Sequence, residues 1–302
     1  MNTFNSERIY EERIHLAVDY ISEHLSEEIS LEKLAAVACF SPFHFHRVFS
    51  TITGETPREF IERVKLEKAA NLLCIVKNKT VEDIAFYCGF KSVSSFSRSF
   101  KKFHGVPPVK YLEKHKHDCH SMNIVSELRL KNFDQADLSL VSIQKTPAYN
   151  VIYAQSLEGY RTGIPKAWTR VLTYARVHGL WREPACLIGL PYNNPGITPY
   201  DKCRYRACIP VEEGVELSKG EIKTQKIESA TCAVFHFKGK RENITDAYSF
   251  LYGFWLRQSG YIPDEKPLME IYPREIVTNS PKIPYTHQEI LEYDIGLPIN
   301  PL

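Results

Sequence analysis

The sequence predicts a two-domain chain: an all-α tandem helix-turn-helix domain, followed by an α+β domain of two pseudo-symmetric β-α-β-β units. Three observations predict this division. One pattern of apolar, glycine and proline positions occurs twice between residues 31 and 111, and a polar, histidine-rich stretch follows at 114–123. Beyond that stretch the apolar spacing changes from a helical period to a strand period. We therefore expect domains at 1–115 and 125–302, joined by a linker at 116–124.

The composition is that of a globular protein, with 43% hydrophobic and 25% charged residues. No run of about 18 apolar residues is present, and residues 1–13 lack the apolar core of a signal peptide. We expect a cytoplasmic protein with no membrane partner. The 8 cysteines form no C-x-x-C pair and no zinc spacing. We expect free thiols, no metal and no cofactor.

The two copies of the repeat share their order and spacing. The first copy has Leu34-Ala35, Phe40-Ser41, Phe45-x-Arg47-x-Phe49 and Gly54-x-x-Pro57-x-x-Phe60. The second has Ile84-Ala85, Phe90, Phe96-x-Arg98-x-Phe100 and Gly105-x-x-Pro108-x-x-Tyr111. The offset is 50 before the turn and 51 after it. A turn absorbs an extra residue more easily than a packed helix does, so this pattern predicts a duplicated helix-turn-helix.

Helix starts are marked by capping residues. Ser30, Ser41, Thr80 and Ser92 are expected N-caps, and Thr56 to Glu59 reads as a capping box. The expected helices cover 11–25, 31–38, 42 onward, 57–76, 81–87 and the segment after Ser92. Helical spacing predicts that the core receives Phe45, Phe49 and Ile52 from the first copy and Phe96, Phe100 and Phe103 from the second.

The opposite faces of these two helices carry the candidate DNA-binding residues, which are Phe43, His46, Arg47, Ser50, Ser94, Ser97, Arg98, Lys101 and Lys102. An arginine suits bidentate bonding to guanine, an aromatic ring suits contact with a thymine methyl, and small hydroxyls and lysines suit phosphates. The alternative is that these are solvated helix faces. The stretch 91–116 also holds seven bases against one acid, whereas 7–32 holds eight acids against two bases. A domain with such a basic end can meet phosphate.

Residues 8–115 resemble the DNA-binding domain of AraC/XylS-type transcriptional regulators, through the two helix-turn-helix motifs and the terminal Gly105-Val-Pro-Pro108-Val-Lys-Tyr111 signature. The resemblance implies double-stranded DNA as a partner, a regulator expected to act as an activator, and contact with RNA polymerase. Phe43 stands where single-domain members usually have tryptophan, and Val93 and Ser94 stand where they often have glutamines. The target sequence is therefore not transferable from relatives.

The second domain shows two similar halves. Strands are expected at 138–143, 148–154, 185–190, 205–211, 231–237, 268–272 and 286–293, with helices at 164–178 and 244–258. The helix ends at His178-Gly179 and Ser259-Gly260 correspond at an offset of 81. Two such halves leave a concave seam, which is a usual place for a small-molecule pocket.

Glu270 is the candidate centre of that pocket, because it interrupts the apolar strand Leu268-Met-Glu-Ile-Tyr272. A buried carboxylate needs a partner or a cation, and nearby aromatic residues favour a cationic or amphipathic ligand through cation–π attraction. The alternative is a solvent-facing glutamate among ordinary core rings. The candidate ligand-binding residues are Trp168, Tyr205, Tyr252, Trp255, Glu270 and Tyr272.

Residues 125–295 resemble GyrI-like effector-binding domains, through Asp201-Lys-Cys-Arg-Tyr205 and the segment from Trp255 through Tyr261 to Tyr272. The resemblance implies a central pocket with an acid at Glu270 and aromatic walls, and hence a small-molecule effector. Arg206 departs from the acid that commonly follows the tyrosine. Two other hypotheses are a hydrolase and a toxin-sequestering module, each using Glu270. Since the sequence shows no second acid, nucleophile–base pair or metal set near Glu270, we expect no enzyme activity.

Overall fold

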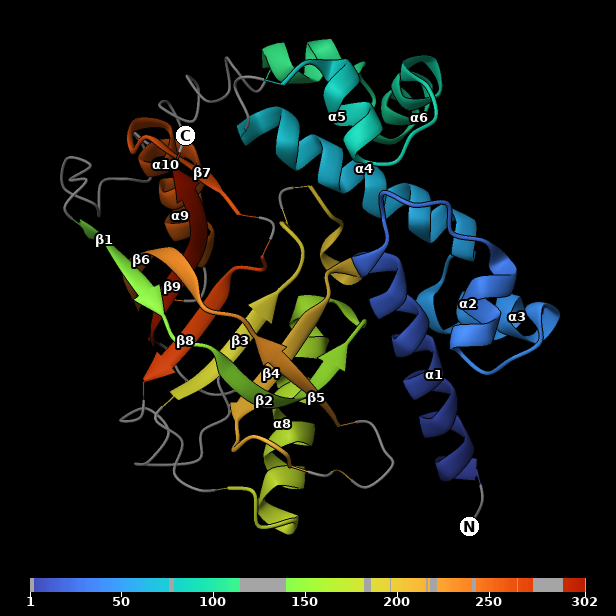
Figure 1. Cartoon of the computed structure of the whole chain (residues 1–302), viewed down its shortest axis with the longest axis vertical. Helices are drawn as coiled ribbons and strands as arrows, with labels where there is room; N and C mark the ends of the chain where they lie inside the picture. Colours follow the sequence, from blue (N-terminus) through green and yellow to red (C-terminus); the bar gives the residue numbers. More distant parts are fainter. Residues whose placement is uncertain are drawn as a thin grey trace. The chain divides into compact units, whose positions relative to one another are not determined.

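The computed structural model describes residues 3–75, 79–114, 140–181, 186–195, 197–215, 217, 222–240, 243–264, 266–273 and 290–301. The chain divides into two compact units, Met1–His120 and Ser121–Leu302 (Figure 1). The expected linker at 116–124 lies outside the described residues. In the part that is described, no helix is long and apolar enough to cross a membrane.

The first unit is built from two successive groups of three helices. They are α1 (Thr3–Glu23), α2 (Leu31–Val37), α3 (Pro42–Thr53), α4 (Pro57–Ile75), α5 (Val81–Tyr87) and α6 (Val93–His104) (Figure 1). The helix α1 begins well before the expected residue 11, because polar residues continue the helix beyond its apolar stripe. At 19 residues α4 is about 28 Å long, at about 1.5 Å per residue.

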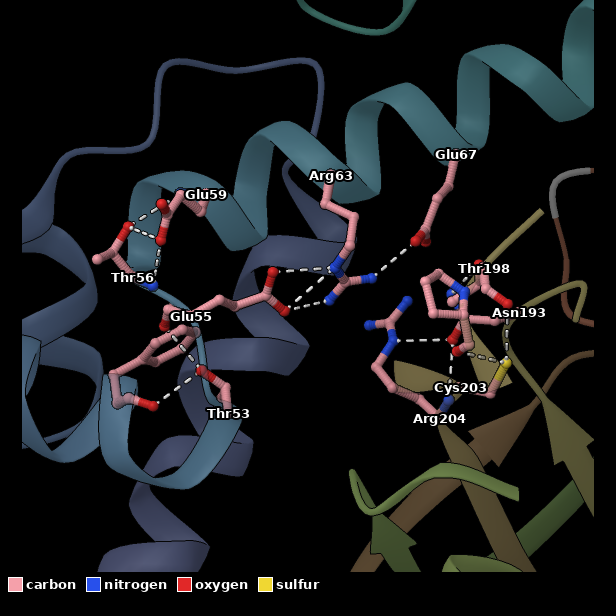
Figure 2. Close-up of polar contacts among 12 residues, drawn as sticks. Thr53, Glu55, Thr56, Glu59, Arg63, Glu67, Asn193, Thr198, Cys203 and Arg204 are labelled. Atoms are coloured by element: carbon pink, nitrogen blue, oxygen red, sulfur yellow. Dashed lines mark hydrogen bonds and ion pairs between the residues drawn. The ribbon is translucent and has the colours of Figure 1, made fainter. Parts of the chain in front are cut away.

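The expected N-caps are confirmed. The side chains of Ser30, Ser41, Thr80 and Ser92 each accept a hydrogen bond from the backbone N–H three residues later. At the start of α4, Glu59 Oε2 accepts from the Thr56 backbone N–H at 2.8 Å, and Thr56 Oγ1 accepts from the Glu59 N–H at 3.3 Å (Figure 2). These local bonds satisfy backbone donors that a helix start leaves open, so they fix where each helix begins.

The duplication extends to the helix that precedes each motif. Gly89 after α5 has a left-handed φ of +75°, and Cys39 at the equivalent turn has +54°. The backbone carbonyl of each residue accepts a hydrogen bond from a basic side chain on the long helix of its own copy. Arg13 Nη1 of α1 donates to the Cys39 carbonyl at 3.0 Å, and Lys65 Nζ of α4 donates to the Gly89 carbonyl at 2.9 Å. The repeating units are therefore α1-α2-α3 and α4-α5-α6.

The extra residue of the second copy is Lys91. The left-handed residues Cys39 and Gly89 are 50 apart, whereas the caps Ser41 and Ser92 are 51 apart, so the insertion lies between them. The Lys91 ammonium lies 2.7 Å from the Glu28 carboxylate in the loop before α2. The insertion thus forms a surface contact and leaves the packed helices in register.

The core of the first unit contains Phe45, Phe49, Phe96 and Phe100, all with no exposed surface. The prediction for Phe103 is wrong, because this side chain is 37% exposed. The His104 ring takes the inward position at the end of α6, with its centroid 4.3 Å from that of Phe100 and 4.9 Å from that of Tyr111. Ile52 is only partly buried.

An ion-pair cluster joins α4 to the turn before it (Figure 2). Arg63 Nη2 lies 2.7 Å from Glu55 and Nη1 lies 2.8 Å from Glu67, and the Arg63 and Glu67 side chains are almost fully buried. Burial alone would lower the pKa of Arg63, but the hydrogen bonds and charges of Glu55 and Glu67 raise it. The guanidinium also covers the Phe60 ring, 4.8 Å from its centroid.

The second unit is a curled antiparallel sheet with helices (Figure 1). Its strands are β1 (Val141–Thr146), β2 (Tyr149–Ser156), β3 (Cys186–Pro191), β4 (Tyr205–Pro210), β5 (Lys223–Ile227), β6 (Ala230–Gly239), β7 (Tyr261–Pro263), β8 (Met269–Pro273) and β9 (Leu291–Pro301). The helices are α8 (Gly159–Val177), η3 (Tyr200–Lys202), α9 (Ile244–Ser249), a π-helical segment η5 (Phe250–Trp255) and α10 (Leu256–Gln258).

The strand order is β1-β6-β9-β8-β3-β4-β2-β5. Its middle is symmetric, because β6-β9-β8 mirrors β2-β4-β3 about the β8–β3 pair. The two ends of this path are joined by one continuous ladder. Strand β1 leads directly into β2, and β5 leads directly into β6. The pairing of β1 with β6 (141–146 with 230–235) therefore continues in the same register as that of β2 with β5 (149–153 with 223–227). The expected pair of β-α-β-β units is thus present, closed by a shared ladder.

Several element bounds differ from expectation. The helix α8 begins before residue 164, and the helix expected at 244–258 is interrupted by the π-helical segment. The strand expected at 286–293 runs instead from Leu291 to Pro301, and residues 286–289 lie outside the described chain. Strands β5 and β7 were not expected. Their sequences carry too few apolar positions for a period of 2 to be recognised.

Candidate DNA-binding and ligand-binding sites

The outward face of α3 carries an ordered aromatic–cation pair. Phe43 is 74% exposed, and the Arg47 guanidinium lies 5.8 Å from its ring centroid. His46 on this face is also exposed. Ser50 differs from expectation, since it is only partly exposed and its buried hydroxyl has no hydrogen-bond partner among the described residues. The exposed part of the predicted face is therefore Phe43, His46 and Arg47.

The outward face of α6 is small and basic. Ser94, Arg98, Lys101 and Lys102 are exposed, and Ser97 is partly exposed. The last turn of the helix holds both lysines, where cations interact favourably with the negative end of the helix dipole. This face has no ring comparable to Phe43, so the two copies present different chemistry.

The start of α4 lies between these two faces. The pKa of Glu59 is lowered by its hydrogen bonds with Thr56, and further by electrostatic interaction with Lys102 on α6 and His46 on α3. A hydrogen bond from Ser99 to Glu62 also joins α6 to α4. The long helix thus holds both candidate faces at fixed positions, although they come from separate copies of the motif.

Glu270 is the centre of the second site. Its side chain is 2% exposed and accepts three hydrogen bonds from tyrosine hydroxyls. Tyr205 and Tyr272 donate to Oε2 at 2.8 and 2.9 Å, and Tyr248 donates to Oε1 at 2.7 Å. The solvent-facing alternative for Glu270 is therefore wrong. Burial, and then the charge of Glu270, raise the pKa of all three tyrosines well above its ordinary value. At neutral pH they are protonated donors.

Gly189 makes this arrangement sterically possible. It lies directly opposite Glu270 across the β3–β8 pair, and opposite Ala207 across the β3–β4 pair. A Cβ added to Gly189 would lie 1.9 Å from the Tyr205 hydroxyl oxygen and 2.9 Å from Glu270 Oε2. Tyr205 therefore crosses the backbone of β3 to reach Glu270, and only glycine leaves room for it.

The structure brings only some of the predicted ligand-binding residues together. Trp168 on α8 is buried, with its ring 6.4 Å from Tyr205 and 5.7 Å from Tyr272 between centroids. Its indole N–H makes no hydrogen bond of good geometry within the described residues. It nevertheless lies close enough to the Tyr205 hydroxyl to lower the pKa of Tyr205, against the larger rise caused by burial.

The other two predicted residues, Tyr252 and Trp255, belong to the π-helical segment η5. Trp255 is 4% exposed and stacks on Tyr261, and burial raises the pKa of Tyr252. Arg206 points to the opposite face of β4 from Tyr205, where it donates to Gln155 and Gln225 at 2.6 Å. Its charge therefore does not border the Glu270 site.

Sequence reasoning missed Tyr248 and Gly189 as site residues. Tyr248 is one of several aromatic residues near Glu270 in the sequence, but helical spacing does not show which ring on a helix reaches a neighbouring strand. For Gly189 a signal was available, since a glycine within the apolar strand Cys186–Pro191 marks a close approach.

Comparison with known families agrees with both halves of this description. Residues 34–114 match a helix-turn-helix domain, and residues 140–298 match the GyrI-like small molecule binding domain. The fold and sites define a chain that joins an AraC-type helix-turn-helix domain to a small-molecule-binding domain. The chain belongs to the GyrI-like small-molecule-binding family, whose match covers more than half of its 302 residues.

Curated relatives match between about a third and a half of this chain. The uncharacterized HTH-type transcriptional regulator YbfP of Bacillus subtilis (strain 168) is 37% identical over 102 residues, covering 34% of each chain. The Right origin-binding protein of Escherichia coli (strain K12) is 30% identical over 141 residues, covering 46% of this chain and 48% of that protein. The chain spans less than half the length of these curated relatives. The crystal structure of the DNA-binding domain of AdpA in complex with a target DNA is 28% identical, with a TM-score of 0.33, covering 35% of this chain and 94% of that one.

Proposed function

We propose that this chain is a sequence-specific DNA-binding transcriptional regulator whose second domain binds a cationic or amphipathic effector at Glu270. The observation that carries the DNA-binding part is the pair of exposed faces on α3 and α6, each with an arginine, joined by one rigid helix. A rod of about 28 Å approaches the 34 Å between successive major-groove faces, so one chain can reach two adjacent turns of DNA.

The exposed faces of α3 and α6 contact different parts of the DNA site. Arg47 is pre-positioned by the Phe43 ring, which favours a guanine contact with an adjacent thymine methyl. On α6, Arg98 reads a base, whereas Lys101 and Lys102 contact phosphates. We further propose that the regulator activates transcription through contact with RNA polymerase, which a transcription assay with purified polymerase would test directly.

Arg98→Ala is expected to relax sequence preference, because the lost contact is to a base edge. The ratio of specific to non-specific affinity should fall about tenfold or more, at about 1–3 kcal/mol per bidentate contact. The measurement is selection of genomic fragments by the full chain at one stated salt concentration, followed by titration on a selected and a scrambled duplex. Arg47→Ala should act alike on the other half of the site.

Lys101→Ala is the matched control. It should weaken binding to both duplexes equally and reduce the salt slope by about 0.9, because it removes one phosphate contact. Equal loss on both duplexes for Arg98→Ala would contradict a base-reading role for that residue. Uniform weak binding that neither arginine changes would contradict DNA reading by both faces.

Glu270→Gln tests the effector site. Replacing the carboxylate by an amide removes the charge that attracts a cation, so the affinity for aromatic ammonium ions should fall at least about tenfold. Binding by the full chain can be followed through the fluorescence of Trp168, which lies against Tyr205 and Tyr272. Glu292→Gln is the control, because Glu292 is a half-exposed acid of the same domain, paired with Lys238. Equal effects of the two variants would contradict a site at Glu270.

A further inference from the structure

The helix α8 of the second domain carries a strongly basic outer face. It holds no acid and four bases, which are Arg161, Lys166, Arg170 and Arg176. Arg170 is partly buried, and the other three are exposed. The inner face of the helix is packed along its length and includes Trp168, which has no exposed surface. The bases are therefore presented to solvent by a helix that the rest of the domain holds in place.

The fold itself does not require this charge. The corresponding segment of the other half, residues 244–258, holds only one acid and one base in its sequence. At the offset of 81 that relates the halves, Lys166 corresponds to Ala247 and Arg170 to Leu251, and both of these apolar residues are buried. The basic face is thus particular to α8, which favours a partner of negative charge over a role in packing.

The bases form two rows on this face. At about 100° per residue, a row of exposed threonines runs along its middle: Thr162, Thr169 and Thr173. Arg161 and Arg176 lie on one side of that row, and Lys166 and Arg170 lie on the other. The hydroxyls of Thr162 and Thr169 donate to backbone carbonyls of Glu158 and Pro165 at 2.9 and 2.8 Å. These short side chains therefore stay close to the helix, between two edges of positive charge.

This arrangement fits the phosphates of double-stranded DNA. An α-helix with its side chains is about 10–12 Å wide and the major groove is about 12 Å wide, so a helix in the groove has a row of phosphates on each side. Cations at both edges of the helix can reach both rows. We propose that the outer face of α8 is a second DNA-contacting surface, which binds phosphates beyond the DNA that α3 and α6 contact. This inference goes beyond the proposed function, in which the second domain binds only the effector.

The bases of α8 are available to a phosphate to different degrees. Lys166 forms an ion pair with Glu158 just before the helix, but both side chains are about half exposed, and such pairs are weak. The Arg176 guanidinium lies 5.6 Å from the centroid of the Trp181 ring. Within the described residues neither Arg161 nor Arg176 is paired with an acid. These two arginines are therefore the ones to replace in a test.

The test measures how the affinity of the full chain for two duplexes depends on salt. Both contain one selected genomic site: the short duplex covers about two helical turns, enough for α3 and α6, and the long duplex adds about two turns on each side. The double variant Arg161→Ala/Arg176→Ala should lower the salt slope on the long duplex by about 1.8, at about 0.9 for each lost phosphate contact, and leave the slope on the short duplex unchanged. Lys145→Ala/Lys226→Ala is the matched control, because it removes two exposed bases of the same domain outside α8. The control should change neither slope.

Each outcome decides the point. If the α8 variant lowers the slope on the long duplex no more than the control does, the second DNA surface is overturned. An unchanged slope together with an altered oligomeric state of that variant in sedimentation would overturn it in favour of an acidic protein partner, such as the stretch 7–32 of a second copy. Arg98→Ala and Lys101→Ala on the short duplex separate the two proposals. If they act there as predicted while the α8 variant has no effect, the DNA-reading function stands and only the surface on α8 fails.

Discussion

Arg63→Leu is expected to lower the free energy of unfolding of the first domain by about 3–5 kcal/mol, the cost of removing one partner from a buried ion pair. Glu67 is 4% exposed and Glu55 is 13% exposed, so their carboxylates would lose a cation in a place that water hardly reaches. The leucine also leaves the Phe60 ring without the guanidinium that covers it. The measurement is chemical denaturation of the full chain, followed by circular dichroism at the helix band.

The chain offers a way to assign the loss to one domain. Its 3 tryptophans, Trp168, Trp181 and Trp255, all belong to the second domain, so their fluorescence reports that domain alone. An early loss of helix signal with an unchanged fluorescence transition is the expected pattern. Arg63→Lys is the control, since it keeps the charge but loses the planar fork, and should cost less. Similar stability of Arg63→Leu and wild type would show that apolar packing at this position replaces the ion pairs.

Gly189→Ala is expected to disrupt the second site, with a loss of unfolding free energy of about 3 kcal/mol, combining overpacking with a broken bond to a charged group. The new Cβ would occupy the position of the Tyr205 hydroxyl. Tyr205 must then move, which changes the geometry around Glu270, so binding of aromatic ammonium ions should also fall. Tryptophan fluorescence reports both changes, because Trp168 packs against Tyr205.

A double-mutant cycle isolates the cause. If Gly189→Ala acts by displacing the hydroxyl, then its cost should be smaller in a Tyr205→Phe background, where that oxygen is absent. Additive costs would show that strain in the β3 backbone, and not the tyrosine, explains the loss. Gly296→Ala is a suitable control, because an added Cβ there would meet its nearest neighbours at 3.8 Å, an ordinary contact distance.

Local signals predicted the first domain well. Ser30, Ser41, Thr80 and Ser92 mark helix starts through bonds to residues only three positions away, so their effect does not depend on the rest of the fold. Phe103 failed because a ring four positions beyond Phe100 competes for the same inward space, and His104 occupies it. Spacing alone does not decide between neighbouring positions at a helix end.

The Glu270 site depends on which residues face each other across paired strands, and the sequence alone does not show this register. Glu270 and its aromatic neighbours were expected at one site from the residue pattern and then from a resemblance, and the structure brings Glu270, Tyr205 and Tyr272 together. Gly189 acts only through its pairing across two strands, and Tyr248 only through the turn of its helix toward β8. Both relations are set by tertiary packing, so the spacing of apolar residues at a period of 2 or 3.6 cannot predict them.

Gly189 and Glu270 are separated by 81 residues, which is the offset that relates the two halves, and they face each other across the central strand pair. Each residue thus stands opposite its own counterpart. Two identical half-domains assembled as a homodimer would have to place two glycines there, or two mutually repelling carboxylates. In this chain the two halves differ at these positions, so a single acid faces a glycine. The surroundings of Glu270 are therefore asymmetric: β8 supplies the charge, and β3 supplies the space that Tyr205 crosses.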